Sequence, residues 1–444
     1  MTVTYSTSDT SIETVLLVGT FGDREEEVEA RNSLDELCAL CETAGAEVAD
    51  RMLCRVVKAH PGTLIGTGKA EEIAERVKAG RISTVVFDDE LSPAQGRNLE
   101  KVIQTKVVDR TQVILDIFAQ HARTREGQMQ IELAQMEYLL PRLRRMWTHL
   151  ERQRGGIGMH GPGEKQLEMD RRRILETMSR YKSRLALVSA RRHEQRRGRR
   201  RHGWALVSLV GYTNAGKSTL INALTEAGVL AYDKLFATLD PTTRQMKLPN
   251  HQQVLLTDTV GFIRKLPHHL VDSFRATLEE VVEADLLVHV IDGSHPQVHQ
   301  QVDAVEQVLK ELGAENKPVL AVLNKMDLEA AREQAHHLRF RFPDAVAISA
   351  ATGEGLEELR NGLADALRKR HVRVGMKVPP GEGKTLAALK ASATIFQLEY
   401  DDEGAAVIDA AIPVRMIGMC RPYVTEGLAE DAWEEEMEEN DGHV

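Results

Sequence analysis

The stretch that decides the fold is Gly211-Tyr212-Thr213-Asn214-Ala215-Gly216-Lys217-Ser218. The apolar residues 204–210 before it are typical of a buried strand, and residues 219–224 after it are typical of the start of a helix. A glycine-containing loop between a strand and a helix directs backbone N–H groups towards an anion. We therefore predict that this loop, extended to Thr219, binds the phosphates of a nucleotide. Lys217 would contact the β- and γ-phosphate oxygens, and Ser218 would be a ligand of Mg²⁺.

The length and composition indicate a soluble protein with about three domains, because 444 residues exceed a single core. We find no apolar run near the roughly 18–20 residues that span a bilayer and no signal-peptide pattern, so we expect a cytoplasmic protein. Four cysteines are too few for a disulfide framework. Cys38 and Cys41 lie on an apolar helical face, which favours buried thiols over a redox or metal pair.

The net charge of −10 is unevenly distributed. Residues 142–201 contain 19 Lys and Arg against 6 Asp and Glu, whereas residues 424–444 contain 9 acidic residues and no Lys or Arg. A concentrated basic segment in an acidic protein indicates a part that binds a polyanion. We expect the acidic tail, residues 424–444, to be disordered.

Residues 11–120 are predicted to form an N-terminal α/β domain, because expected strands and helices alternate along them. The expected strands are 15–19, 48–58 and 83–87, and the expected helices are 25–43, 70–79 and 92–103. Residues 63–70 are similar to a second phosphate loop. Thr63 stands where the first glycine belongs and Ala70 where a hydroxyl belongs, so we favour a turn before a helix.

Residues 121–202 are predicted to form a basic, antiparallel helical hairpin with a glycine-rich tip. Apolar residues recur there at spacings of three and four, which indicates two helical seams. The first seam is Met129, Leu133, Met136, Leu140, Leu143, Trp147 and Leu150; the second is Leu167, Ile174, Met178, Tyr181, Leu185 and Val188. Residues 155–163 between them contain five glycines, and arms of about 25 residues are expected. Pro141 is expected to kink or break the first arm.

The tip of this hairpin is flanked by basic side chains. They are Arg152, Arg154, Lys165, Arg171, Arg172 and Arg173. Glycine lets a backbone approach another surface closely, and Lys and Arg neutralise phosphate. We therefore predict that residues 152–173 contact RNA without reading its sequence. The alternative is a solvated coiled coil with an ordinary loop.

Residues 203–370 have the motif spacing of a GTP-binding domain. Residues 255–257 form an expected strand that runs into Asp258-Thr259-Val260-Gly261, where Asp258 would lie behind a Mg²⁺-bound water and the Gly261 N–H would contact the γ-phosphate. The segment Phe236-Ala237-Thr238-Leu239-Asp240 precedes it. A hydroxyl there can close on Mg²⁺ and the γ-phosphate, which makes this segment a switch. We favour Thr238, with Thr242 as the alternative.

The base-binding residues follow further along the chain. An expected strand at 319–323 ends in Asn324-Lys325-Met326-Asp327, whose terminal carboxylate can accept hydrogen bonds from guanine N1 and the 2-amino group. Asn324 would brace the loop and Lys325 would cover the base. Ser349-Ala350-Ala351 would offer a backbone N–H to the guanine O6. The order of these motifs favours GTP over ATP.

The catalytic residues are predicted to be Lys217, Thr238, Gly261 and Asn214. Many GTPases place a glutamine after the Asp-x-x-Gly motif to orient the attacking water, but Phe262 stands there. We therefore expect slow intrinsic turnover and an external surface that completes the site. Asn214 suggests either a K⁺ ion between the β- and γ-phosphates or a brace for the switch segment.

Residues 371–423 are predicted to form a small C-terminal α/β domain. Strands are expected at 371–378 and 405–414, and a helix at 384–396. No chemistry is evident in this part of the sequence.

These motifs together resemble the HflX family of GTPases over nearly the full length. The resemblance rests on residues 155–158 and 161–164, on the run from Asp258 to Phe262, and on Asn324 to Asp327. It implies binding to the ribosome, chiefly the large subunit, through the N-terminal region and the glycine-rich tip. It also implies faster GTP hydrolysis when bound, and splitting of stalled ribosomes under stress. At the tip, His160 and Lys165 replace the Arg and Thr that the family usually carries.

The expected architecture is an N-terminal α/β domain with a long helical hairpin, a P-loop GTPase domain with a mixed sheet and helices on both faces, and a small C-terminal α/β domain. We expect a GTPase that uses Mg²⁺, acts on the ribosome as a monomer, and couples hydrolysis to splitting, rescue or recycling. The alternatives are a GTPase of ribosome assembly, or a GTP-sensing module whose hydrolysis matters little.

Overall fold

The computed structural model describes residues 13–143, 162–201, 204–225, 235–236, 238, 242–250, 252–265, 275–368, 371–413 and 416–426. The chain divides into two compact units. Unit 1 is Met1–Leu187 with Tyr232–Leu239 and Lys265–Phe274; unit 2 is Val188–Ala231, Asp240–Arg264 and Arg275–Val444. No described helix combines the length and apolar character that crossing a bilayer requires.

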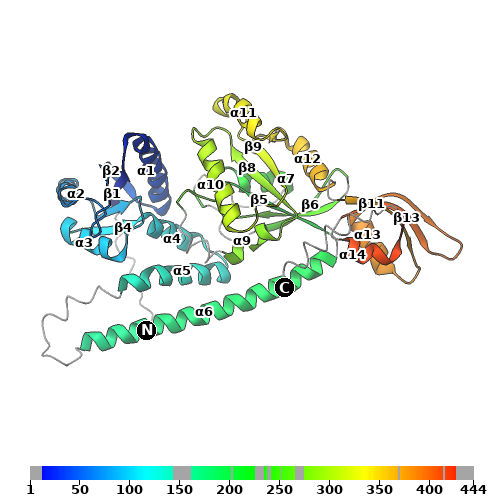
Figure 1. The fold of residues 1–444 in the computed structure, drawn as a ribbon, viewed down its shortest axis with the longest axis horizontal. Coiled ribbons are helices and arrows are strands. Elements are labelled where there is room, and N and C mark those ends of the chain that lie inside the picture. The colour runs from blue at the N-terminus through cyan, green and yellow to red at the C-terminus, as the bar shows by residue number, and fades with distance from the viewer. Residues whose placement is uncertain are drawn as a thin grey trace. The chain divides into compact units, whose positions relative to one another are not determined.

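The N-terminal part of unit 1 is an α/β domain, as expected, and consists of a parallel sheet with helices on both faces (Figure 1). Its strands, in the order β2-β1-β3-β4, are β1 (Thr14–Phe21), β2 (Glu47–Arg55), β3 (Thr84–Phe87) and β4 (Lys106–Asp109). Its helices are α1 (Arg24–Ala44), α2 (Thr67–Gly80), α3 (Pro93–Ile103) and α4 (Arg110–His121). Apolar side chains of α2 and α3 pack on one face of the sheet, while α1 and α4 pack against each other on the opposite face.

Local chemistry fixes the ends of these helices. Asp23 caps α1 by accepting hydrogen bonds from two backbone N–H groups, and Gly45 ends α1 in the left-handed region at φ 92°. Residues 63–66 precede α2 as a turn, in agreement with the expectation for that stretch. Among the described residues, the four cysteines are free and buried, and none belongs to a cluster of three or more potential metal ligands. Burial raises the pKa of Cys41 to about 12, so its thiol stays protonated.

The edge strand β2 carries charged side chains along much of its length. Asp50 forms an ion pair with Arg76 at 3.1 Å, and Arg51 forms one with Asp35 of α1. Buried side chains occur only in the second half of the strand, at the alternate positions Met52 and Cys54. These ion pairs place charge along the strand that borders the sheet.

A buried ion cluster lies at the carboxyl ends of β3 and β4. Arg110 is 2% exposed and pairs with Asp88 at 2.8 Å and with Glu36. Asp88 also accepts from Ser33 at 2.7 Å and from Lys265 at 2.5 Å. Burial alone would raise the pKa of the Asp88 carboxyl, but Arg110 and Lys265 outweigh it and hold that pKa below its usual value. The Asp88 carboxylate is therefore kept ionised.

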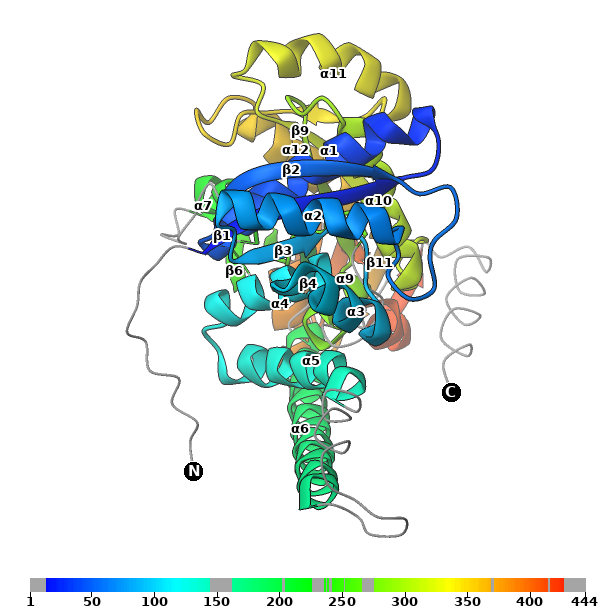
Figure 2. The same cartoon turned by 90° about the vertical axis from the view of Figure 1, so that its left-hand side faces the viewer.

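Two long helices complete unit 1: α5 (Arg125–Leu143) and α6 (Pro162–Arg201), the latter extending into unit 2. They lie side by side (Figures 1 and 2), joined by Tyr181 to Glu132 at 2.6 Å and by Lys182 to Glu137 at 2.8 Å. The second arm, α6, has 40 residues, so the expected 25 was wrong for it; the end of the first arm, beyond Leu143, lies outside the described residues.

Pro141, which was expected to kink or break the first arm, lies inside α5 and does not break it. Two residues of helix follow it, and residues 144–161, which include most of the glycine-rich tip, lie outside the described residues. Arg142 next to it donates to Leu91 and Asp109, and these bonds fix this turn of α5 on the N-terminal sheet domain.

The central part of unit 2 is a six-stranded mixed sheet, as expected, in the order β10-β9-β8-β5-β7-β6 with only β6 antiparallel. The strands are β5 (Ala205–Val210), β6 (Thr242–Lys247), β7 (Gln253–Asp258), β8 (Leu286–Asp292), β9 (Val319–Asn324) and β10 (Val346–Ala347). The helices are α7 (Lys217–Thr225), α9 (Arg275–Val282), α10 (Val298–Glu311), α11 (Glu329–Arg341) and α12 (Leu356–Arg368). Side chains of α7 and α12 join one apolar cluster on the sheet, and side chains of α10 and α11 join another.

The C-terminal part of unit 2 is a small α/β domain, as expected. It contains β11 (His371–Val378), α13 (Gly383–Ser392), β12 (Thr394–Tyr400), β13 (Ala406–Pro413), α14 (Ile417–Cys420) and β14 (Val424–Glu426). The sheet is antiparallel in the order β12-β13-β11-β14. The helix expected at 384–396 ends at Ser392, because the β-branched and aromatic residues Thr394, Ile395 and Phe396 favour a strand. Residues 424–426 belong to the sheet, which corrects the start of the expected tail.

Candidate functional site

The phosphate loop joins the end of β5 to the start of α7. Gly211 has φ +150°, and a side chain there would collide with the Val290 carbonyl. Gly216 has φ +91°, and a side chain there would collide with Asn324. Both positions therefore require glycine, for backbone conformation and for space. Asn214 also adopts the left-handed region, at φ 62°.

Lys217 begins α7 and is buried inside the loop. Its Nζ donates to the carbonyl oxygens of Gly211 at 3.0 Å and Tyr212 at 2.8 Å. Burial lowers the pKa of Lys217 to about 8, and the charge of Asp258 opposes that shift only in part. To contact a phosphate, the amine would exchange these two carbonyls for phosphate oxygens.

Two motifs distant in sequence meet at the candidate Mg²⁺ site. The Ser218 hydroxyl donates to Asp258 Oδ2 at 2.7 Å, and Asp258 lies at the carboxyl end of β7. A hydroxyl beside a carboxylate is an oxygen donor set that suits a hard cation such as Mg²⁺. These residues therefore fit the ion, which would be held directly by Ser218 and through water by Asp258.

The switch segment is described only in part. Ala237, Leu239 and Asp240 lie outside the described residues, and Thr238 is half-buried. Phe236 belongs to unit 1, where its ring meets Phe118 of α4 edge-on at 4.7 Å between centroids. The alternative hydroxyl, Thr242, is the cross-strand neighbour of Asp258 in the β6–β7 register. The strand register therefore places Thr242 next to Asp258, a residue of the candidate Mg²⁺ site.

The Asp-x-x-Gly segment packs directly on the phosphate loop. A side chain at Gly261 would come within 2.8 Å of the Thr213 Cα and 3.1 Å of Lys217 Nζ. Phe262 donates its N–H to the Gly211 carbonyl at 3.1 Å and accepts from the Thr213 N–H at 2.8 Å. Its ring is 1% exposed, so Phe262 is a core residue and offers nothing to a water molecule. Thr259 donates to the Leu209 carbonyl at 2.5 Å.

Asn324 joins the phosphate loop to the base-binding segments. Its Nδ2 donates to the Ala215 carbonyl at 2.8 Å, and its Oδ1 accepts from the Ala350 N–H at 3.0 Å. Asp327 accepts from the Ser349 hydroxyl at 2.7 Å. The structure thus brings together three stretches that are more than 20 residues apart in sequence. Met326 is buried and packs in the core beneath this loop.

Sequence reasoning missed Asp292. This residue ends β8, stands opposite Asn324 in the register, and pairs with Lys325 Nζ at 2.7 Å. The pair holds a lysine whose backbone has φ +66°. The available signal was position, because Asp292 ends a parallel strand at the sheet edge where ligands bind.

Comparison with known proteins places these motifs in one family. Three family models match: "GTP-binding GTPase N-terminal" at residues 31–119, "GTP-binding GTPase Middle Region" at 121–199, and "50S ribosome-binding GTPase" at 206–325. The chain is 47% identical over 400 residues to GTPase HflX of Lacrimispora saccharolytica, which covers 90% of this chain and 93% of that protein. The chain belongs to the HflX family of GTPases. It is accordingly an enzyme that binds and hydrolyses GTP.

Other HflX proteins match this chain with similar sequence identity and coverage. GTPase HflX of Escherichia coli is 44% identical over 403 residues, covering 90% of this chain and 94% of that protein. A GTP-binding protein of Sulfolobus solfataricus, solved with GDP, is 26% identical and covers 80% of this chain and 98% of that chain, with a TM-score of 0.41. The HflX assignment therefore rests on the sequence matches and on the motifs that the structure brings together.

Proposed function

We propose that this HflX GTPase binds the large ribosomal subunit and couples GTP binding and hydrolysis to ribosome splitting, rescue or recycling. The observation that carries the proposal is the match of residues 206–325 to the ribosome-binding GTPase family. The basic helix supports it, because Arg172 and Arg173 of α6 are 80% and 77% exposed. Exposed arginines on a long helix suit the phosphates of ribosomal RNA.

Sedimentation through sucrose gradients tests this proposal. Ribosomes are mixed with the protein and GTP, GDP or a non-hydrolysable GTP analogue. Splitting predicts loss of 70S particles with the analogue. A GTPase of ribosome assembly would sediment only with immature particles, and a GTP sensor would bind 70S particles without changing them. Either of those patterns would replace the proposal.

In the proposed nucleotide complex, Lys217 and the loop N–H groups hold the β- and γ-phosphates, while Ser218 and Asp258 hold Mg²⁺. The Thr238 hydroxyl would contact Mg²⁺ and the γ-phosphate, and the Gly261 N–H would contact the γ-phosphate. Asp327 accepts from guanine N1 and the 2-amino group, and the residues from Ser349 to Ala351 face O6. These assignments are supported by the contacts that link the phosphate loop, Asp258 and Asn324. Asp327→Asn should weaken GTP binding and improve binding of xanthosine triphosphate, whose base carries an acceptor in place of the amine.

We further propose that hydrolysis is slow until a ribosomal surface completes the site. The support is the burial of Phe262, which leaves no glutamine-like group at the position that orients water in many GTPases. GTP turnover should therefore rise on adding large subunits. Equal rates with and without subunits would refute this.

Asn214 leaves a choice between K⁺ binding and a bracing role. Its backbone has φ 62°, and its side chain is exposed on the solvent side of the loop. We propose K⁺ activation. The phosphate loop, residues 211–218, contains no arginine, so a cation between the phosphates would supply the positive charge that neutralises them. Turnover should be faster in K⁺ than in matched Na⁺ buffer, and Asn214→Ala should remove the difference. Indifference to the cation would leave the bracing role.

A further inference from the structure

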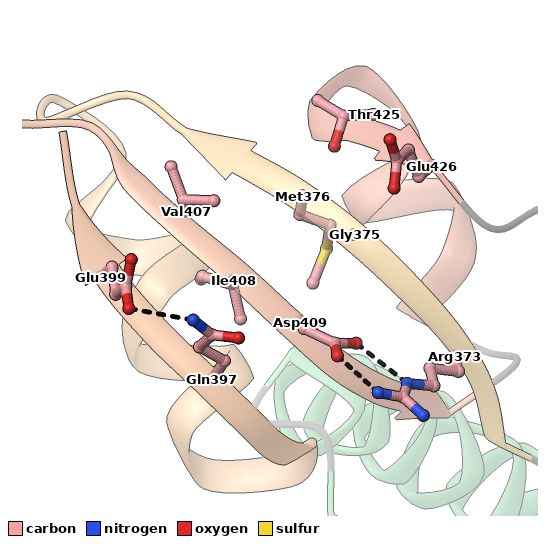
Figure 3. Close-up of a pocket in the computed structure, with 10 residues that line it drawn as sticks. All are labelled: Arg373, Gly375, Met376, Gln397, Glu399, Val407, Ile408, Asp409, Thr425 and Glu426. Carbon is pink, nitrogen blue, oxygen red and sulfur yellow. Dashed lines mark hydrogen bonds and ion pairs between the residues drawn. The ribbon is translucent and has the colours of Figure 1, made fainter.

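Among the described residues, helices cover one face of the small C-terminal sheet and leave the other open. Val374, Met376, Ile408, Ala410 and Ile412 form the covered face together with α13 and α14. The alternate residues of the same strands form the open face (Figure 3). A hollow of about 550 Å³ lies on it, lined by Arg373, Gly375, Gln397, Glu399, Val407, Asp409, Thr425 and Glu426 of this face together with the buried residues Met376 and Ile408.

Gly375 forms part of the floor of this hollow. Its φ is not positive, and a side chain there would meet nothing closer than 3.5 Å. The backbone therefore does not need glycine at this position, and the missing side chain leaves room above the strand. Val407, which pairs with Lys377 two residues further along β11, is 46% exposed and adds apolar surface to the hollow.

The walls of the hollow carry an unbalanced negative charge. Of the described residues that line it, Arg373 alone is cationic, and it donates to Asp409 from Nε at 3.1 Å and from Nη2 at 2.6 Å. Glu399 accepts a hydrogen bond from the neutral Gln397 at 2.9 Å, and Figure 3 shows Glu426 on the other side of the hollow. Neither glutamate pairs with a cation among the described residues. The nearby Lys377 is held by Asp401 at 2.8 Å and by Glu403.

We propose that this open face is a docking surface for an extended, Lys- and Arg-rich protein segment, of the kind that proteins bound to ribosomal RNA carry. The inference rests on the proposed ribosome binding and names a partner for the C-terminal domain. Two cationic heads would pair with Glu399 and Glu426, and their aliphatic stems would cross Gly375 and Val407. RNA does not suit the face, because its phosphates share the sign of the two glutamates. The acidic residues 430–441 of this chain do not suit it for the same reason.

The strand spacing sets the pattern of the partner. Glu399 on β12 and Glu426 on β14 are three strand intervals apart and offset by two residues along the strands, or roughly 16 Å at about 4.8 Å per interval and about 3.4 Å per residue. An extended segment advances about 3.4 Å per residue, so side chains four residues apart lie on one side at roughly 14 Å. The segment should therefore carry Lys or Arg at positions i and i+4.

The test uses the full-length protein and a synthetic nine-residue peptide with two arginines four residues apart in a Gly/Ser background. The double variant Glu399→Gln/Glu426→Gln should weaken peptide binding about tenfold, since each exposed ion pair contributes up to a few-fold. Gly375→Val should also weaken it by filling the hollow, without lowering the unfolding temperature. The matched control Asp402→Asn removes an exposed acid outside the hollow and should leave binding unchanged.

Each outcome decides the proposal. Equal peptide binding by the wild type and the double variant, or no peptide binding by the wild type, would overturn it. Binding of a poly-uridine oligonucleotide that the double variant alters would assign the face to RNA and also overturn it. Large-subunit sedimentation keeps the two proposals apart: failure of the wild type to bind subunits would refute ribosome binding, whereas the peptide assay still tests the face.

Discussion

Asn324→Ala is the sharpest test of the site, because it removes one side chain that holds two buried backbone groups. Asn324 is 2% exposed, donates to Ala215 and accepts from Ala350. Its loss leaves the Ala215 carbonyl and the Ala350 N–H without these partners, at about 1–3 kcal/mol each. We expect a local destabilisation of about 2–5 kcal/mol and a fall in the affinities for both GTP and GDP.

Hydrogen exchange at Ala350 measures this effect where it occurs, since a chain of two units need not unfold in one step. An opening free energy lower by about 2–5 kcal/mol speeds exchange of that amide about 30- to 5000-fold. Fluorescent GDP titration gives the affinity. The control is Asn98→Ala, which removes a comparable donor to the Gly62 carbonyl at 2.8 Å in unit 1. Unchanged exchange at Ala350 in Asn324→Ala, or an equal loss of GDP affinity in the control, would refute the bridging role.

Three further outcomes follow from buried charges. Because the pKa of Lys217 is lowered to about 8 and phosphates restore its charge, nucleotide binding at pH 8.5 should take up protons that it does not take up at pH 7; calorimetry in buffers of different ionisation enthalpy measures this. Burial lowers the pKa of His289 to about 3, so its contribution to stability falls by about 1.4 kcal/mol per pH unit as pH drops below 6.5, and His289→Phe should flatten the acid side of the stability profile. Arg110→Met leaves Asp88 buried with fewer partners and should destabilise unit 1 by about 3–5 kcal/mol in urea unfolding, whereas Arg31→Met, at an exposed ion pair, should cost under about 1 kcal/mol.

The sequence was most informative where glycine and strand ends coincide. Gly211 and Gly216 mark a loop whose backbone only glycine fits, and Asp258 and Asn324 end buried strands. Local pattern is enough for such positions, because parallel strands bring their carboxyl ends to one edge.

Long-range polar pairing could not be predicted in the same way. Lys265 and Asp88 are 177 positions apart, and the local sequence around either residue does not predict that the two form an ion pair. Asp292 was missed for the same reason, since its partner Lys325 looked like a base-covering residue alone. The length of α6 was underestimated because the expected arm followed the apolar seam from Leu167 to Val188, while the helix begins at Pro162 and the basic run from Arg191, which has high helix propensity, extends it.

The charged border formed by β2 affects how the protein behaves among its neighbours during synthesis. In the described part of the chain no strand pairs with the outer edge of β2, whose nine residues are long enough to offer N–H and C=O groups to another extended chain. The ion pairs at Asp50 and Arg51 make such pairing unfavourable, because a second chain would have to displace or desolvate them. Neutralising both residues should therefore leave the fold intact while promoting self-association of newly made chains.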